Sequence, residues 1–229
     1  MPRNKVHSIV VLGGFLVFAG LGALFVQRSI SGRLRTSIAP KENRKQSFTK
    51  WNQWAVDTAV SMLGEGYIVL RMGQGADSYL LSQLNQKDKT YSHCGIVFIE
   101  NGYPFVYHSI GGEDNPDERL RRDSAQFFFS PLHNLSLAVV QYDFDEAHIN
   151  KLRSIVYGYY KQRPKFDLKF DLKTDDKLYC AEFVYKAVNS AMEDTGYIKT
   201  TTLLGCTFVG IDDIFINHHA DIIWQTKFK

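Results

Sequence analysis

A cysteine at the start of a predicted helix raises the first question of chemistry. Residues 177–188 read KLYCAEFVYKAV, and their apolar residues recur at the three- and four-residue spacing of one helical face. Cys180 falls where that helix begins, and a helix N-terminus favours the thiolate form of cysteine. Two interpretations follow: Cys180 is either a nucleophile or a small buried residue at a helix end.

Two histidines lie in a predicted β-hairpin. His93 and His108 belong to runs at residues 91–100 and 103–109 that read as strands, and the Asn101-Gly102 pair between them is a strong signal for a two-residue turn. Counting outward from this turn makes the two histidines diagonal neighbours on one face of the sheet, separated by ~7–8 Å at the backbone. A slip of one residue would separate them.

A cysteine and two histidines allow three kinds of site. In nucleophilic catalysis one histidine is the general base for a thiol, and a second group orients its ring. A metal pair would need a third ligand, for which Cys180 or Asp114 could be proposed. Two half-buried histidines that bind backbone groups are the plain structural alternative. The three residues together favour catalysis.

The bulk composition fits one globular domain with an appended segment. The chain has 229 residues, 45% of them hydrophobic, and a net charge of +3 that does not require a nucleic-acid partner. Its three cysteines include no CxxC pair, so neither a disulfide framework nor a four-cysteine zinc site is expected. Cys94 and Cys206 read as residues of the core, or of a loop in the case of Cys206.

The N-terminal segment reads as a membrane anchor. Ile9–Val26 contains no charge and is about long enough to span a bilayer. We expect an anchor or uncleaved signal at residues 1–27, a basic linker at 28–47 and a folded domain at 48–229. A cleaved signal peptide is the competing interpretation. The count of basic residues favours a cytoplasmic domain, although a long domain translocates regardless of such charge.

The domain itself reads as α+β with an antiparallel sheet. Besides the hairpin, we expect strands at residues 67–72, 135–142 and 222–228, and helices at 48–63, 79–84, 145–161, from 180 and at 211–217. Residues 111–119 and 163–177 read as loops. The apolar stripe of the first helix is expected to comprise Trp51, Trp54, Ala55, Thr58 and Met62.

Three stretches together resemble a known family. The chain is similar to the circularly permuted NlpC-type papain-like cysteine hydrolases, the YiiX/YaeF/YebB-like group, from about Gly66 onward. GYIVL at residues 66–70 matches an early strand, YSHCGIV at 91–97 the strand with the base, and YCAEFV at 179–184 the nucleophile helix. Tyr67, Cys94 and Ala181 depart from the family pattern. The resemblance implies a permuted papain-like fold with a central antiparallel sheet packed by helices.

The same resemblance implies roles for individual residues. Cys180 becomes the nucleophile and His93 the base, while His108 occupies the place of the third polar group. The Cys180 backbone N–H is the natural oxyanion donor. Three further residues are candidates for substrate or oxyanion contacts, with the alternative for Glu182 that it only caps the helix: Tyr179, Glu182 and Tyr91.

The leading expectation is a membrane-anchored thiol hydrolase that needs no metal or cofactor. By resemblance its substrate is a cell-envelope compound such as a peptidoglycan peptide, and the domain lies on the periplasmic side of a bacterial inner membrane, against the charge count. Alternatives are a lipid acyl hydrolase or acyltransferase, for which Phe127–Phe129 would line an apolar groove, and an inactive binding module. A metal-binding protein is the weakest of the alternatives.

Overall fold

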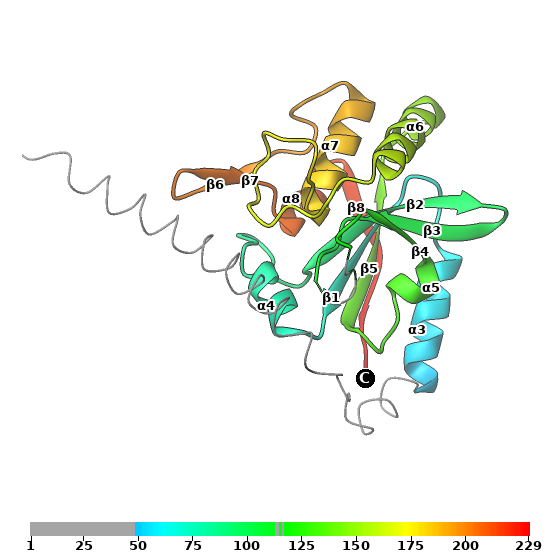
Figure 1. Cartoon of the computed structure of the whole chain (residues 1–229). Helices are drawn as coiled ribbons and strands as arrows, with labels where there is room; N and C mark the ends of the chain where they lie inside the picture. The colour runs from blue at the N-terminus through cyan, green and yellow to red at the C-terminus, as the bar shows by residue number, and fades with distance from the viewer. Residues whose placement is uncertain (1–48, 113–114, 116) are drawn as a thin grey trace, which may run out of the picture.

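An antiparallel six-stranded sheet forms the centre of the domain (Figure 1). The computed structural model describes residues 49–112, 115 and 117–229. The strand order is β4-β3-β2-β1-β5-β8, and each neighbouring pair is antiparallel. The strands are β1 (Ile68–Gly73), β2 (His93–Glu100), β3 (Tyr103–His108), β4 (Arg121–Ser124), β5 (Asn134–Tyr142) and β8 (Ala220–Lys227).

The β2–β3 hairpin has the register expected from its turn. Glu100 pairs with Tyr103, and the ladder continues to Ile96 opposite Tyr107. Asn101 and Gly102 have φ values of 51° and 81°, which are the positive angles that a type I′ turn requires. The local chemistry of this turn therefore fixes which side chains of the two strands share a face.

Helices cover the two faces of the sheet (Figure 1). The cluster of buried residues on one face includes Leu70, Ile96 and the helices α6 and α7; the cluster on the other face includes Val69, Val97 and the helices α3 and α5. The alternation of Val69 with Leu70 shows the two-residue period of a strand that is buried on both sides. The helices are α3 (Lys50–Ser61), α4 (Ala76–Ser82), α5 (Ala125–Phe128), α6 (Glu146–Gln162), α7 (Cys180–Met192) and α8 (Ile211–Phe215).

The first helix buries a different face from the one expected. The side chains of α3 that are buried are Asn52, Ala55, Val56 and Ala59. The predicted stripe is wrong for Trp51, Trp54 and Met62, which are 38%, 51% and 38% exposed, and right for Ala55, which is fully buried. Small side chains let α3 approach its neighbours closely, whereas the large indoles of Trp51 and Trp54 lie outside this buried face.

Four short elements were not expected from the sequence. β4 and α5 follow the polar loop, and β6 (Thr201–Leu203) with β7 (Cys206–Phe208) forms a separate two-stranded hairpin. Cys206 therefore lies in a strand and is half-buried, rather than in the core or a loop. The helix expected at residues 79–84 begins earlier, at Ala76. Phe128 and Phe129 are core residues, and Phe127 is exposed.

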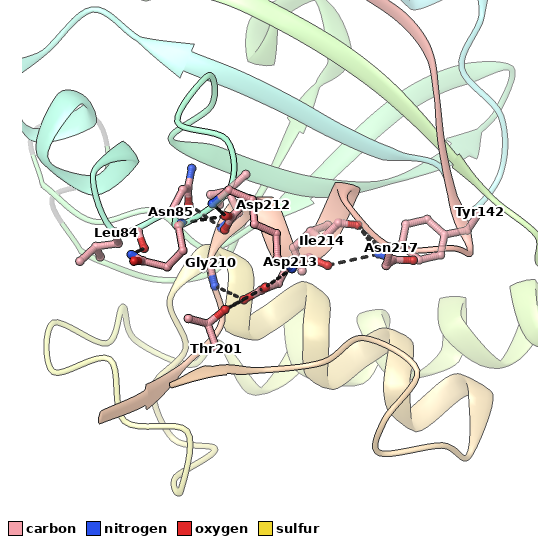
Figure 2. A network of polar contacts seen from close by, with 12 residues as sticks. Leu84, Asn85, Tyr142, Thr201, Gly210, Asp212, Asp213, Ile214 and Asn217 are labelled. Carbon is pink, nitrogen blue, oxygen red and sulfur yellow. Dashed lines mark hydrogen bonds and ion pairs between the residues drawn. The ribbon is translucent and has the colours of Figure 1, made fainter. Parts of the chain in front are cut away.

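A polar network holds α8 against the loop before β2 (Figure 2). The Asp212 carboxylate accepts hydrogen bonds from the backbone N–H groups of Gln86 and Lys87, at 2.8 and 2.6 Å. Asp213 accepts bonds from Gly210 N and Thr201 Oγ1, at 2.9 and 2.8 Å. These buried carboxylates satisfy backbone donors that would otherwise be unpaired, and they join the C-terminal third of the chain to the loop that leads into β2.

The predicted membrane anchor and linker lie outside the described residues. Within residues 49–112, 115 and 117–229, no helix is long and apolar enough to cross a bilayer.

Candidate active site

Cys180 is the first residue of α7, as the sequence predicts. Tyr179 is the extended N-cap residue, with φ −87° and ψ 170°. The Glu182 carboxylate accepts a hydrogen bond from Tyr179 N at 3.2 Å, which is half of a capping box. Cys180 is 7% exposed and belongs to the larger core cluster. Backbone N–H groups of the first helical turn, those of Cys180 and Ala181, lie beside its thiol.

His93 and His108 meet in the structure. His93 Nε2 lies 2.9 Å from His108 Nδ1, and the two rings cross edge to face with centroids 5.0 Å apart. The hairpin argument is therefore confirmed in its geometry, while the catalytic role of the pair stays a prediction. On the other side of the His108 ring, Nε2 lies 3.0 Å from the Asp123 carboxylate. A chain of polar contacts therefore runs from His93 through His108 to Asp123.

The Asp123 carboxylate determines the tautomers of His108 and His93. An ionised Asp123 only accepts hydrogen bonds, so His108 Nε2 must carry the proton and His108 Nδ1 must accept. His93 Nε2 then donates to His108, which leaves the lone pair of a neutral His93 on Nδ1. That nitrogen forms no hydrogen bond with any residue in the described part of the chain. A neutral His93 therefore presents a basic nitrogen away from His108.

Burial and positive neighbours keep both rings neutral. Burial, followed by Arg71 and His108, lowers the pKa of His93 well below its ordinary value. Burial lowers the pKa of His108 to about 4, although the hydrogen bond to Asp123 opposes this change. Burial raises the pKa of Asp123, but hydrogen bonds from His108 and Arg121 outweigh it and hold that pKa below its ordinary value.

Arginines and an aromatic ring hold this chain of polar groups in place. Arg121 donates to Asp123 at 2.8 Å. The Phe128 ring lies 5.6 Å from the His93 ring and 5.2 Å from the His108 ring, centroid to centroid. Arg71 stacks over the same phenyl ring and donates to the Phe128 carbonyl. Side chains that cannot rotate freely keep both imidazoles in one orientation.

The thiol of Cys180 has a second cysteine as its partner. The Cys94 side chain, next to His93 on β2, forms a hydrogen bond with Cys180. This bond, with backbone N–H groups that include that of Ala181, lowers the pKa of Cys180 against the effect of burial. Burial raises the pKa of Cys94 well above its ordinary value. No hydrogen bond joins Cys180 to His93 among the described residues. The structure therefore brings together His93 and His108 of the predicted triad, whereas the thiol of Cys180 contacts Cys94.

The tyrosines that were expected to contact substrate are engaged in the core. The Tyr179 hydroxyl accepts a hydrogen bond from Val209 N at 2.8 Å. The Tyr91 hydroxyl donates to Gln225 Oε1 at 2.9 Å, and its ring packs edge to face on Phe215. Tyr179 and Tyr91 are 2% and 1% exposed. Both hydroxyls therefore already have structural partners.

Glu182 caps α7, which is the alternative role expected for it from the sequence. Its side chain is fully buried and forms an ion pair with Lys186 at 2.9 Å. Burial raises the pKa of Glu182 to about 7, against the effect of Lys186 and of the Tyr179 N–H. These contacts are those of a helix cap with a titratable charge.

Asp123 is the site residue that sequence reasoning missed. It lies in RRDS, a run without the apolar alternation of a strand. β4 nevertheless pairs with β3, and His108 is opposite Arg121 in that ladder. Asp123 and Arg121 are two residues apart and thus on the same face as His108. Only knowledge of this third strand could have identified the carboxylate.

The described residues do not fit a metal centre. They contain no group of three or more His, Cys, Asp or Glu side chains that could hold a metal ion. The two histidine nitrogens that approach each other, His93 Nε2 and His108 Nδ1, are joined by a hydrogen bond. Asp114, proposed above as a third ligand, lies outside the described residues.

Comparison with known proteins supports the fold. No protein-family model matches the sequence, and no curated protein matches it. Among solved structures, the crystal structure of the metalloprotein YiiX from Escherichia coli O157:H7 matches with a TM-score of 0.57 and 17% sequence identity, over 71% of this chain and 97% of YiiX.

The chain has a YiiX-like fold. At this identity the similarity concerns the fold alone. It agrees with the α+β architecture and the antiparallel sheet expected from the sequence, whereas the permuted papain-like assignment stays a prediction. The word metalloprotein is said of YiiX alone.

Proposed function

We propose that this chain is a cysteine hydrolase of the permuted papain-like type, with Cys180 as nucleophile and His93 as general base. The observation that carries the proposal is the chain of polar contacts from Asp123 through His108 to His93. It fixes a neutral His93 with its lone pair on Nδ1, which is the state that a base needs before it accepts a thiol proton.

Cys180 has the second property that the proposal requires. Its thiol is at the start of α7, and its pKa is below the ordinary value. A thiolate is the reactive form of cysteine, and a lowered pKa increases the thiolate fraction at neutral pH. The backbone N–H of Cys180 lies in the first helical turn beside its thiol, and it can stabilise an oxyanion that forms on a carbonyl bound there.

The reaction proceeds by acyl transfer. Cys180 Sγ bonds to the carbonyl carbon of the substrate, its proton passes to His93 Nδ1, and the carbonyl oxygen becomes an oxyanion. The intermediate collapses as the carbon–nitrogen or carbon–oxygen bond breaks, and the leaving group takes the proton from His93. A water molecule, deprotonated by His93, then hydrolyses the thioester and restores the Cys180 thiol.

One rearrangement is required before the first step. The thiol of Cys180 contacts Cys94, and His93 is the residue that precedes Cys94 on β2. Cys94 and Cys180 belong to the buried cluster on one face of the sheet, whereas Phe128, on which the His93 ring packs, belongs to the cluster on the other face. The thiol and His93 Nδ1 must therefore approach each other at the start of β2 before the first step.

The proposed substrate class is an amide of the cell envelope, such as a peptidoglycan peptide, acted on by a domain that residues 1–27 anchor to the membrane. The family resemblance and the uncharged run Ile9–Val26 support this choice. Lipid acyl transfer receives no added support from Phe127–Phe129, because Phe128 and Phe129 are fully buried.

Alkylation of the full-length chain by iodoacetamide across the pH range tests the proposal. Cys206 is a half-buried free thiol, so Cys206→Ala removes its background reaction and serves as the reference protein. We expect the reference to react with an apparent pKa below the ordinary ~8.5 of cysteine. Further substitution Cys180→Ala should abolish this reaction, and His93→Gln should move it to higher pH.

Hydrolysis is measured on the same proteins with cell-wall peptides and with lipid esters. We expect cleavage of the peptides by the reference and none by Cys180→Ser. An alkylation profile that is identical in the reference and His93→Gln, together with no cleavage of either substrate, would refute the hydrolase and favour a binding module. Cleavage of lipid esters alone would keep the nucleophile and change the substrate class.

A further inference from the structure

Every tryptophan of the chain lies in one place on the domain. The sequence contains three, Trp51, Trp54 and Trp224. The Trp51 and Trp54 rings lie 4.9 Å apart, and the Trp54 and Trp224 rings 6.0 Å apart, centroid to centroid. The first two belong to the start of α3 and the third to β8, so elements from opposite ends of the described chain build this tryptophan patch.

Two rings of the patch are exposed, the Trp224 ring is half-buried, and a cation lies over one of the exposed rings. Trp51 is 38% and Trp54 51% exposed, whereas the face of α3 that packs on the domain uses small residues. Lys229 Nζ lies 4.0 Å from the Trp51 ring centroid. Asn52 fixes this arrangement, because its side chain donates to Lys229 O and accepts from Lys229 N, each at 2.8 Å. The rings are thus held at the surface by a built contact.

We propose that the tryptophan patch, Trp51, Trp54, Trp224 and Lys229, docks in the interfacial layer of a lipid bilayer. Indole rings combine an apolar body with a polar N–H, and with Lys or Arg they are the side chains enriched where hydrocarbon meets headgroups. A lysine stem over an indole provides the same combination of apolar contact and charge at one point. This inference rests on the membrane anchor of the proposed function and not on the catalytic role of Cys180.

The sequence indicates why the partner is a bilayer. Ile9–Val26 is an uncharged run of bilayer-spanning length, and Trp51 follows Val26 by 25 residues (51 − 26). Even a fully extended chain of that length reaches at most about 90 Å. A patch so close to a membrane segment meets lipid at high effective concentration, so modest affinity is enough for docking.

Intrinsic fluorescence tests the proposal on the full-length chain, because all tryptophan emission originates in the patch. The chain is incorporated into vesicles of phosphatidylcholine and phosphatidylglycerol, and flotation establishes that it is bound. A matched preparation contains phospholipids brominated in their acyl chains, which quench indoles only at contact range. We expect at least a twofold loss of emission with brominated lipid and protection from aqueous iodide.

Two variants make the result specific. Trp51→Phe/Trp54→Phe leaves Trp224 as the emitter and should reduce quenching by brominated lipid, whereas Trp224→Phe should retain it. Emission that brominated lipid leaves unchanged and iodide quenches fully would overturn the proposal. Emission protected from both quenchers would show that a second copy or another protein covers the patch, and this result would also overturn lipid docking. A chain that fails to float with vesicles would overturn it as well.

Discussion

The buried carboxylate of Glu182 allows a quantitative prediction about pH. Burial raises its pKa to about 7, from an ordinary value of 4.5. A carboxyl whose pKa is raised in the folded state favours folding in its protonated form. Its contribution to stability is fully present below the unfolded-state pKa and is lost as the pH rises through the folded-state pKa.

The size of this loss follows from the shift. A difference of roughly 2.5 units, at about 1.4 kcal/mol per unit, corresponds to about 3 kcal/mol between pH ~4 and pH ~8. Glu182→Gln retains an acceptor for the Tyr179 N–H and removes the titration. Lys186 then keeps Asp175, at 2.7 Å, as an ionic partner. We therefore expect the variant to gain about 3 kcal/mol relative to the wild type as the pH rises over this range.

Urea unfolding of the wild type and Glu182→Gln, each at a series of pH values, measures the difference. Titration of all other groups is common to the two proteins and cancels in the difference. The same experiment with Ser190→Ala, an uncharged substitution at an exposed position of α7, is the control and should give a flat difference. A difference between wild type and Glu182→Gln that does not change with pH would refute the assignment of a titrating, buried Glu182.

Three further predictions concern the polar chain and the cysteine pair. Cys94→Ala removes the hydrogen bond that lowers the pKa of Cys180, so alkylation of Cys180 at neutral pH should slow, as a stopped alkylation series would show. Because the His108 pKa is lowered to about 4, the protein loses stability as the pH falls below 6.5, by about 3 kcal/mol at pH ~4. Acid unfolding curves of His108→Gln should lack this loss. Asp123→Asn removes a charged acceptor from His108, so urea unfolding should show a loss of about 2 kcal/mol, and a value near zero would contradict the role given to Asp123.

Local sequence signals predicted the parts of the site that depend on local geometry. Asn101-Gly102 fixed the hairpin register, and with it the meeting of His93 and His108, because the turn type admits one pairing. The start of α7 at Cys180 follows from helix periodicity and a capping glutamate. Such signals act over a few residues, so they are readable in one sequence.

The missed features depend on contacts that are distant in sequence. Asp123 is in a charged edge strand whose only reason to be a strand is its pairing with β3. The contact of Cys94 with Cys180 joins residues of β2 and α7, and no short-range pattern encodes it. In α3, tertiary packing selected the small side chains of Ala55 and Ala59 for burial and left the tryptophans outside, where hydrophobicity alone places the larger residues inside.

The reciprocal bonds between Asn52 and Lys229 also have a consequence for how the chain folds. They join residues 177 positions apart, and β8 completes the sheet beside β5, which is much earlier in the chain. Contacts of such long sequence separation are formed late, since the entropy of closing a large loop must be overcome first. During synthesis, β5 therefore keeps an unpaired edge until residues 220–227 have left the ribosome. A nascent chain stalled before that point exposes a strand edge that chaperones or other chains can bind.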